Sequence, residues 1–275
     1  MGKIVVTGGT GFIGKHLINA LAEQNLDIVS ISRTGIRNES INHSIEQINL
    51  DLSQDSSQTQ LSLIRNVSAI VHCAGTTISN SETDCIDTVE NNTKIIISLL
   101  KYATEQNIEK FIFISTNKLQ SKNYNAYVMS KEIGEKIIKY TNARYNKKYT
   151  ILRLCNIYGE DENITRIIPH LLQGIINEDK LKIHSPLKTL IEFCSIDVVI
   201  NEIKKILFSV TDSHSYLCIK SEFCTSIFDL KNMLENILVN INTEQSDSVL
   251  SYQERQLLPT VQFYQQRFKE GMRYE

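Results

Sequence analysis

The sequence contains no tryptophan, only three prolines and no cysteine pair with Cys-x-x-Cys spacing. No apolar run approaches 18 residues, so no transmembrane helix is predicted. The net charge of -2 gives no electrostatic reason to bind nucleic acid or an anionic membrane surface. The N-terminus enters an apolar strand pattern at once and has no signal-peptide layout. These absences predict a cytoplasmic location and partners other than nucleic acid or membrane.

The six cysteines give no metal-ligand spacing, so no metal site is predicted. Several of them lie in apolar runs, where a free thiol packs as a small hydrophobe and indicates a reducing compartment. The chain has 275 residues, of which 41% are hydrophobic and 22% charged. This length allows one large or two small domains and a full core without disulfides.

The strongest motif lies in the first fourteen residues. The β-branched run Lys3–Thr7 predicts a buried parallel strand, and glycines follow at positions 8, 11 and 14 before a helical pattern. Gly8 permits a tight turn, Gly11 lets a pyrophosphate approach the backbone, and Gly14 lets the helix pack closely on the strand. Phosphates would bind the free N–H groups at the helix start. The alternative, an ordinary glycine-rich turn, is disfavoured by the position directly after a strand.

Strand and helix patterns alternate up to Gly159, which predicts an α/β fold with a Rossmann-type, doubly wound parallel sheet covered by helices on both faces. The predicted strands after the first are residues 27–32, 45–52, 69–73, 110–115 and 150–154. The predicted helices are residues 17–22, 56–65, 83–103 and 126–145.

Beyond Gly159 the pattern loosens, and all three prolines lie there. We expect helices over residues 164–176, 197–209 and 227–239, a strand over 215–219 and one more helix in the last twenty residues. The predicted domains are residues 1–159, which bind a dinucleotide, and residues 160–275, a smaller lobe with some segments returning to the first sheet.

The residue type at the end of the second predicted strand indicates whether the chain binds NAD or NADP. An acidic residue there accepts from the adenosine ribose and favours NAD, whereas a basic residue accommodates a 2′-phosphate and favours NADP. Ser32 stands in place of the acid, and Arg33 follows it, with Arg37 close behind. The alternative reading of Arg33 is a solvated loop residue. The sequence therefore favours NADP, with NAD as the alternative.

A Tyr-x-x-x-Lys spacing occurs at Tyr127 and Lys131, one loop after Ser115 and Thr116. Positions i and i+4 of a helix share a face, so the ammonium of Lys131 would lie near the phenol of Tyr127. A nearby positive charge favours a phenolate, which suits Tyr127 to exchange a proton. The spacing alone is common on helix surfaces, and its position after Thr116 makes it specific. The Thr116 hydroxyl could bond the same substrate oxygen.

Together these residues resemble the extended short-chain dehydrogenase/reductases, in particular the nucleotide-sugar epimerase/dehydratase group. The resemblance covers nearly the whole chain and is densest over residues 3–159. The matching motifs are Gly8–Gly14, Asp51-Leu52, Val71–Gly75, Asn92, Phe113–Thr116, Tyr127-x-x-x-Lys131 and Leu152–Gly159.

The resemblance implies that Tyr127 exchanges a proton with the substrate, that Lys131 also holds the nicotinamide ribose, and that Thr116 polarises a carbonyl. Asn92 would stand beside the site or make a structural hydrogen bond. Asn156 would contact a nucleotide sugar, the implied substrate of the second lobe. The implied substrate-binding residues are Thr116, Tyr127 and Asn156. The implied cofactor-binding residues are Gly8, Thr10, Gly11, Phe12, Ile13, Gly14, Arg33, Asp51, Leu52, Ala74, Gly75 and Lys131.

The sequence departs from the family pattern in two places. Sugar 4,6-dehydratases of the group carry an Asp-Glu pair after the Ser/Thr, but Asn117 and Lys118 stand here. Many members also carry an Arg-Asp-Phe stretch whose Arg binds substrate phosphate. Residues 190–193 occupy that region with Leu-Ile-Glu-Phe, and Lys188 is the nearest cation.

The predicted function is reduction of a 4-keto-6-deoxy sugar nucleotide with NADP in surface-polysaccharide synthesis. One alternative is a C4 epimerase with tightly held NAD. Another is a catalytically silent dinucleotide-binding regulator, against which Tyr127, Lys131 and Thr116 argue. The family often forms homodimers, and the sequence does not decide this.

Overall fold

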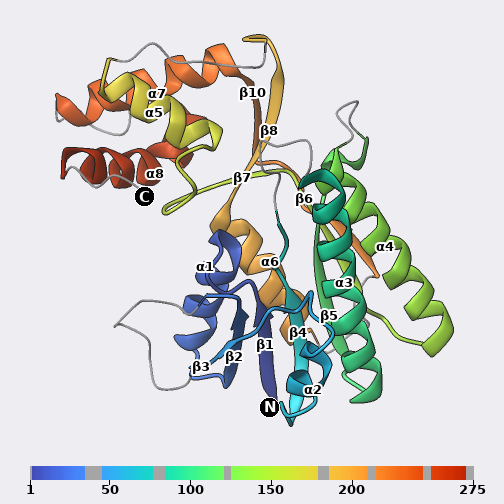
Figure 1. Ribbon diagram of the computed structural model, residues 1–275. Helices are drawn as coiled ribbons and strands as arrows, with labels where there is room; N and C mark the ends of the chain where they lie inside the picture. Colours follow the sequence, from blue (N-terminus) through green and yellow to red (C-terminus); the bar gives the residue numbers. More distant parts are fainter. Residues whose placement is uncertain are drawn as a thin grey trace. The chain divides into compact units, whose positions relative to one another are not determined.

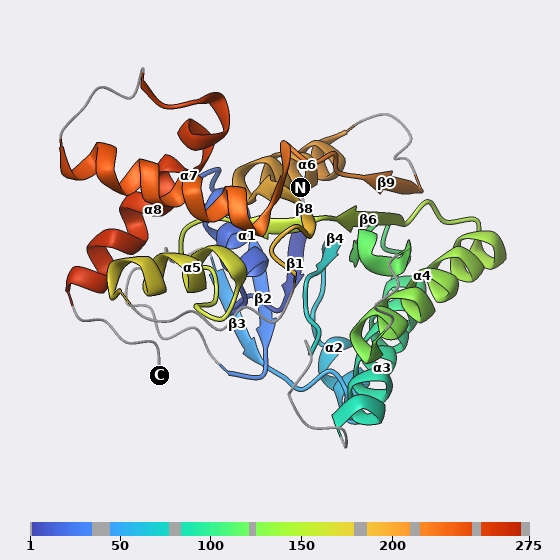
Figure 2. The same cartoon turned by 90° about the horizontal axis from the view of Figure 1, so that it is seen from above.

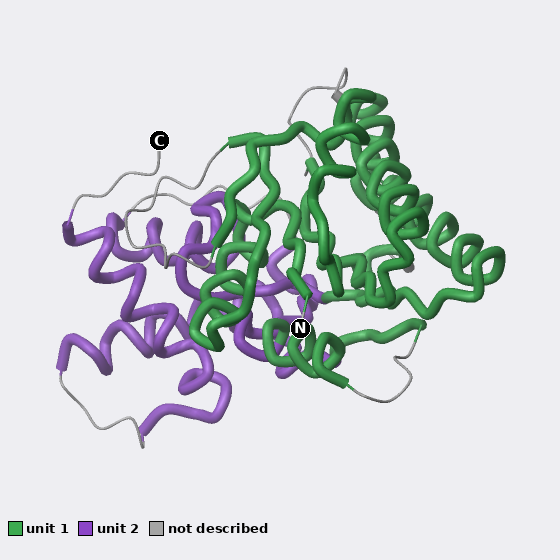
Figure 3. The backbone as a smooth tube through the Cα atoms, turned by 90° about the horizontal axis from the view of Figure 1, so that it is seen from below, with its two compact units in different colours: residues 1–154, 199–219 green, residues 155–198, 220–275 purple. Residues whose placement is uncertain are grey.

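The computed structural model describes residues 2–34, 45–76, 84–120, 125–178, 186–209, 215–243 and 249–270 (Figure 1). Arg37 lies outside these ranges. The chain forms two compact units, which Figure 3 colours separately. Unit 1 comprises Met1–Leu154 and Val199–Ile219, and unit 2 comprises Cys155–Val198 and Lys220–Glu275.

Unit 1 contains a seven-stranded sheet in the order β3-β2-β1-β4-β5-β6-β9, in which every neighbouring pair is parallel. The chain builds outward from the interior strand β1 through β2 to β3, then crosses to the other side of β1 and continues with β4. This reversal is the switch point at which parallel α/β sheets bind ligands. The strands are β1 (Lys3–Thr7), β2 (Ile28–Ser32), β3 (Ile45–Asn49), β4 (Val67–His72), β5 (Lys110–Thr116), β6 (Thr150–Leu154) and β9 (Tyr216–Cys218).

Helices cover both faces of this sheet. Figure 2 shows α3 and α4 on one face and α6 on the opposite face. Residues of β1 are buried in succession, as expected for a central parallel strand. The helical elements are α1 (Phe12–Ala22), α2 (Ser57–Leu61), α3 (Asp84–Glu105), the 3-10 turn η1 (Asn117–Gln120), α4 (Ala126–Tyr145) and α6 (Ile196–Phe208), which belongs to unit 1 from Val199 on.

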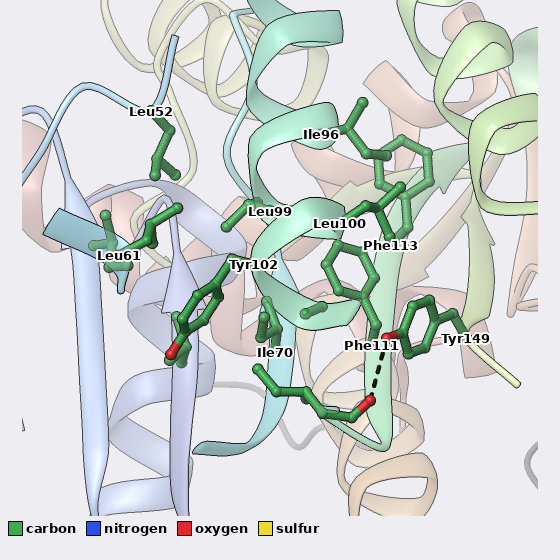
Figure 4. Packing of buried hydrophobic residues seen from close by; sticks show 14 of the residues in the cluster. Leu52, Leu61, Ile70, Ile96, Leu99, Leu100, Tyr102, Phe111, Phe113 and Tyr149 are labelled. Atoms are coloured by element: carbon green, nitrogen blue, oxygen red, sulfur yellow. Dashed lines mark hydrogen bonds between the residues drawn. The ribbon is translucent and has the colours of Figure 1, made fainter. Parts of the chain in front are cut away.

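The core between α3, α4 and the sheet is built from aliphatic residues and a few large aromatic rings (Figure 4). Phe111 and Phe113 of β5 lie in it, and Tyr149 packs on Phe111 with ring centroids 5.4 Å apart. The Tyr149 hydroxyl donates to the Ile108 carbonyl oxygen at 3.2 Å, so this buried polar group has its partner.

Unit 2 contains a three-stranded sheet in the order β10-β8-β7. Tyr158, Phe193 and Phe223, one from each strand, pack together, with Phe193 and Phe223 stacked at 5.3 Å between centroids. The elements are β7 (Asn156–Tyr158), α5 (Ile167–Ile176), β8 (Leu190–Ser195), β10 (Phe223–Ser226), α7 (Ile227–Asn242) and α8 (Tyr252–Lys269).

The predicted fold class is confirmed, and each predicted strand and helix corresponds to an element of the same type. The sequence analysis missed the sheet of unit 2. Its strands are three to six residues long, too short to show a period of two against their surroundings. None of the helices described here is long and apolar enough to cross a membrane.

Candidate functional site

The glycine-rich loop forms a tight turn between β1 and α1. Gly8 has a φ of +72°, in the left-handed region that favours glycine, and the Gly11 N–H donates to the Gly8 carbonyl oxygen at 2.9 Å. A Cβ on Gly14 would lie 2.1 Å from the same oxygen, so a side chain is excluded there. Gly11 is the N-cap of α1 and provides no side-chain cap. The first amides of α1 therefore remain available to an anion.

A cavity of about 640 Å³ opens at the carboxyl ends of β1, β2 and β4 in unit 1. Eight of the predicted cofactor-binding residues line it: Gly8, Thr10, Gly11, Arg33, Asp51, Leu52, Ala74 and Gly75. The cavity lining does not include Phe12, Ile13, Gly14 or Lys131. A glycine turn, a helix N-terminus without a side-chain cap and a cavity at the switch point together fit a dinucleotide.

The side of the cavity next to β2 and β3 carries charge of both signs. Two hydrogen bonds from Ser53, one from its N–H at 3.0 Å and one from its hydroxyl at 2.7 Å, reach the same oxygen of Asp51. These bonds, and to a lesser degree the charge of Arg33, lower the pKa of Asp51 and stabilise its carboxylate form. Ser32 donates to the Thr34 carbonyl oxygen at 2.5 Å. Arg33 is exposed and lines the cavity, where it is the one cationic side chain among the described lining residues.

Several lining residues were missed by the sequence analysis, among them Ser53, Gln54, Asn91 and Ile95. Asn91 and Ile95 are one helical turn apart on α3, so their i, i+4 spacing was a signal that they share a face. Ser53 and Gln54 directly follow the predicted Asp51-Leu52 pair at the sheet edge.

The loop after β4, which also lines the cavity, is held by side chains of its neighbours. The Ala74 N–H donates to Thr7 Oγ1 at 3.3 Å, and Thr7 Oγ1 lies 2.8 Å from His72 Nδ1. Burial, together with the charge of Lys131, holds the pKa of His72 well below its usual value, so the imidazole is neutral. A neutral imidazole can accept a hydrogen bond from the Thr7 hydroxyl, which in turn accepts from the Ala74 N–H and holds the start of the loop.

Asn92 of α3 connects the same loop to α4. Its amide oxygen accepts from the Thr76 N–H at 2.8 Å, and its nitrogen donates to the Thr76 carbonyl at 3.1 Å and to Ser130 Oγ at 3.0 Å. The Ser130 hydroxyl donates to the Tyr127 carbonyl oxygen at 2.7 Å. Asn92 therefore makes structural hydrogen bonds, which was one of its two predicted roles, and these bonds join the loop after β4 to the helix of Tyr127.

Tyr127 and Lys131 share one face of α4, as predicted. The Lys131 ammonium lies 5.6 Å from the centre of the Tyr127 ring and 4.8 Å from that of Phe113, and it donates to the Ile114 carbonyl oxygen at 2.8 Å. Gly134 brings the helix close to β5, since a Cβ there would lie 2.7 Å from the Phe113 ring. Thr116, at the end of β5, is buried and accepts from the Lys118 N–H at 3.2 Å.

Gly75 lies between the cavity and this helix. It lines the cavity, and a Cβ built on it would lie 3.6 Å from the Lys131 nitrogen. Burial lowers the pKa of Lys131 to about 8, and burial raises the pKa of the neighbouring Cys73 thiol to about 12. The site therefore holds an ammonium close to its titration point beside a neutral thiol and a neutral imidazole.

The buried ammonium predicts a pH dependence of stability. The pKa of Lys131 falls from its ordinary 10.5 to about 8 on folding, so between these values the unfolded chain binds a proton that the folded chain has lost. The contribution of Lys131 to the stability of the wild type must then rise with pH in this window, by about 3 kcal/mol from the size of the shift. Lys131→Met removes the titrating group and should lack this rise. Denaturant unfolding of both proteins from pH 7 to 10.5 measures it, and a stability difference that stays constant with pH would contradict the expectation.

Asn156, the predicted sugar-nucleotide contact, lies in unit 2. It begins β7, and its side-chain nitrogen donates to the Glu192 carbonyl oxygen of β8 at 3.2 Å. Where the family pattern has its arginine, Ile191 packs against the core of unit 2 and Leu190 is exposed. This stretch of β8 therefore presents no cation, in agreement with the departure noted in the sequence.

A family model described as "NAD dependent epimerase/dehydratase family" matches residues 4–215. Among relatives, a UDP-glucose 4-epimerase of Azospirillum brasilense is 25% identical over 191 residues, which are 62% of this chain and 55% of that protein. A dTDP-4-dehydro-6-deoxyglucose reductase of Escherichia coli is 27% identical over 203 residues, with 64% and 63% covered. The chain thus spans about half to two thirds of the length of these relatives.

The solved structure of a UDP-glucose 4-epimerase from Thermotoga maritima with UDP-glucose superposes with a TM-score of 0.82. The superposition covers 97% of this chain and 99% of that one at 18% sequence identity, so the likeness is one of fold.

Proposed function

Because the chain belongs to the NAD-dependent epimerase/dehydratase family, we propose that it is an NADP-dependent reductase of a 4-keto-6-deoxy nucleotide sugar, used in surface-polysaccharide synthesis. The observation that carries the choice of cofactor is Arg33, which lines the cavity at the end of β2, where no carboxylate follows the strand. The Escherichia coli relative, named for reduction of a 4-dehydro-6-deoxy sugar nucleotide, supports the reaction class.

In this proposal the bound cofactor supplies the hydride for the carbonyl carbon. Tyr127 donates the proton to the carbonyl oxygen, and Thr116 donates a hydrogen bond to the same oxygen. The ammonium of Lys131, 5.6 Å from the Tyr127 ring, stabilises the phenolate that remains and holds the nicotinamide ribose. Asn117 and Lys118 stand where a dehydratase has its acid and base, so the carboxyl groups that the dehydratases use to remove water are missing at these two positions.

Unit 2 serves as the substrate lobe in this proposal, with Asn156 contacting the nucleotide sugar. The lack of a cation at Ile191 means that the substrate diphosphate is bound differently from the family pattern.

Arg33 should decide the preference for NADPH over NADH. A guanidinium binds a 2′-phosphate through charge-assisted hydrogen bonds, worth about 1.5–3 kcal/mol, or roughly 10- to 100-fold in affinity. Arg33→Ala should lose that factor for NADPH and leave the affinity for NADH nearly unchanged. Fluorescence titration of both cofactors with both proteins measures it. Equal affinity of the wild type for the two cofactors would refute the assignment.

The second candidate is a C4 epimerase with retained NAD. It is favoured by the Azospirillum brasilense relative and by the fold of the Thermotoga maritima enzyme. An epimerase regenerates its cofactor in each turnover, whereas a reductase consumes NADPH in proportion to product.

One assay distinguishes the candidates. The purified protein is incubated with NADPH and, in parallel reactions, with a panel of 4-keto-6-deoxy sugar nucleotides and a panel of hexose nucleotides, and absorbance at the nicotinamide band is followed together with product analysis. Stoichiometric loss of NADPH is the expected result. If NADPH stays constant while a C4-epimeric hexose nucleotide accumulates, the epimerase is correct. Formation of a 4-keto-6-deoxy product from a hexose nucleotide would instead show dehydration and contradict the role assigned to Asn117 and Lys118.

A further inference from the structure

Helix α4 carries a third functional group on the face of Tyr127 and Lys131. Glu135 follows at the next i+4 position, and it is 2% exposed. Arg153 donates to both of its carboxylate oxygens, from Nε at 2.7 Å and from Nη2 at 2.6 Å. The Ser115 hydroxyl donates to Oε1 at 2.7 Å. A bidentate guanidinium and a hydroxyl together fix the carboxylate in one orientation.

The two partners of Glu135 are neighbours across the sheet. Ser115 of β5 and Arg153 of β6 are paired in register, so one carboxylate joins the ends of both strands to α4. Arg153 also lies 4.9 Å from the centre of the Tyr216 ring on β9, which extends the contact to a third strand. Lys139, one turn further along α4, is 3.9 Å from Glu135 and mostly exposed, so Arg153 is the main counter-ion.

The position of this cluster relates it to the proposed chemistry. Ser115 directly precedes Thr116, and Lys131, one turn before Glu135, bonds the carbonyl oxygen of Ile114 on the same strand. Residues 114 and 115 of β5 are therefore both tied to the helix that carries Tyr127. A misplacement of about 1 Å between reacting groups can cost about 100-fold in rate. The bond between Ser115 and Glu135 ties β5 to α4, and so restrains the position of Thr116 on the strand relative to Tyr127 on the helix.

We infer that Glu135 is a positioning residue that acts through Ser115 to set where Thr116 stands relative to Tyr127. The inference rests on the proposed roles of Thr116 and Tyr127. A purely structural role, in which the Glu135–Arg153 pair only holds the sheet and helix together, is the alternative. The positioning role and the structural role predict different turnover for a variant that lacks the Ser115 hydroxyl but keeps the Glu135–Arg153 ion pair.

The test compares Ser115→Ala with Tyr149→Phe. Each variant removes one hydroxyl from a buried residue of unit 1, and Tyr149→Phe does so away from the site, at its bond to Ile108. Ser115→Ala should lower kcat about 10-fold with KM for the cofactor unchanged, whereas Tyr149→Phe should leave kcat within about twofold. Similar melting temperatures of the two variants show that stability is not the cause. Equal kcat values in the two variants would overturn the inference.

A readout without substrate separates this inference from the proposed function. The protein is labelled with 3-fluorotyrosine, and the ¹⁹F resonance of Tyr127 is assigned with Tyr127→Phe. Ser115→Ala should shift that resonance, and Tyr149→Phe should not. If the wild type reduces no keto sugar, the proposed function fails, and the resonance still decides the inference. An unchanged resonance in Ser115→Ala would overturn it.

Discussion

Replacing Tyr127 by phenylalanine is expected to lower turnover by about 10²- to 10⁴-fold, the usual contribution of general acid–base catalysis. The variant keeps the aromatic ring, whose centre lies 5.6 Å from the Lys131 ammonium. It loses only the hydroxyl that would transfer the proton. Because Tyr127 does not line the cofactor cavity, affinity for the cofactor should survive. Steady-state kinetics with a 4-keto-6-deoxy sugar nucleotide, combined with a cofactor titration, gives both quantities.

Tyr140→Phe is the matched control for this change. Tyr140 lies on the same helix, and its side chain is 66% exposed, so loss of its hydroxyl should leave both turnover and stability unchanged. Near-normal turnover in Tyr127→Phe would remove this residue from the mechanism. The candidates for the proton donor would then be the hydroxyl groups of Ser115 and Thr116 at the end of β5.

Gly14→Ala is expected to destabilise unit 1 by about 3 kcal/mol, the upper end of the usual cost of overpacking. The added Cβ would lie 2.1 Å from the Gly8 carbonyl oxygen and 2.8 Å from the Gly8 carbonyl carbon. These are backbone atoms, which cannot rotate away as a side chain can, so the turn between β1 and α1 must move. Affinity for the cofactor should fall with it, because the turn carries the amides that would bind phosphate. Denaturant unfolding and a cofactor titration measure the two effects.

Gly11→Ala is the comparison for this substitution. A Cβ on Gly11 meets only the Gly8 carbonyl oxygen, at 3.3 Å, and Gly11 lines the cavity. Its methyl group should therefore cost about 1 kcal/mol, clearly less than Gly14→Ala, because alanine is a poorer N-cap than glycine, and it should weaken cofactor binding. Equal stability of Gly14→Ala and the wild type would contradict the predicted destabilisation. It would mean that the backbone at Gly8 moves away from the added Cβ at little cost in free energy.

The sequence predicted those parts of the fold whose cause is local. Helix α4 spans residues 126–145, as predicted, because its apolar spacing and the Asn125 cap, which accepts from Val128 at 3.0 Å, lie within the segment. The turn at Gly8, Gly11 and Gly14 was likewise predictable from the spacing of these glycines after β1. The sheet of unit 2 could not be predicted, because its short strands are stabilised by pairing between segments far apart in the chain.

The same distinction holds within the candidate site. Tyr127 and Lys131 are visible as a spacing on one helix, and the structure places them together. Glu135 gave no signal, since a glutamate in a helix usually faces solvent, and its burial depends on Arg153 and Ser115, 18 and 20 residues away. Asp51 was predicted from its motif, but the two bonds from Ser53 that lower its pKa appear only in the folded chain. The catalytic roles themselves stay predictions.

The start of α1 has a consequence for how this protein can evolve. Serine or aspartate at the N-cap, in place of Gly11, would satisfy a free amide of the first turn and stabilise the helix by a few tenths of a kcal/mol over glycine. The same side chain would occupy the place predicted for a phosphate of the dinucleotide. Selection for thermal stability and selection for affinity therefore act on this position in opposite directions. A thermostable variant obtained by screening for folding alone would be expected to gain a cap here and to lose its ligand.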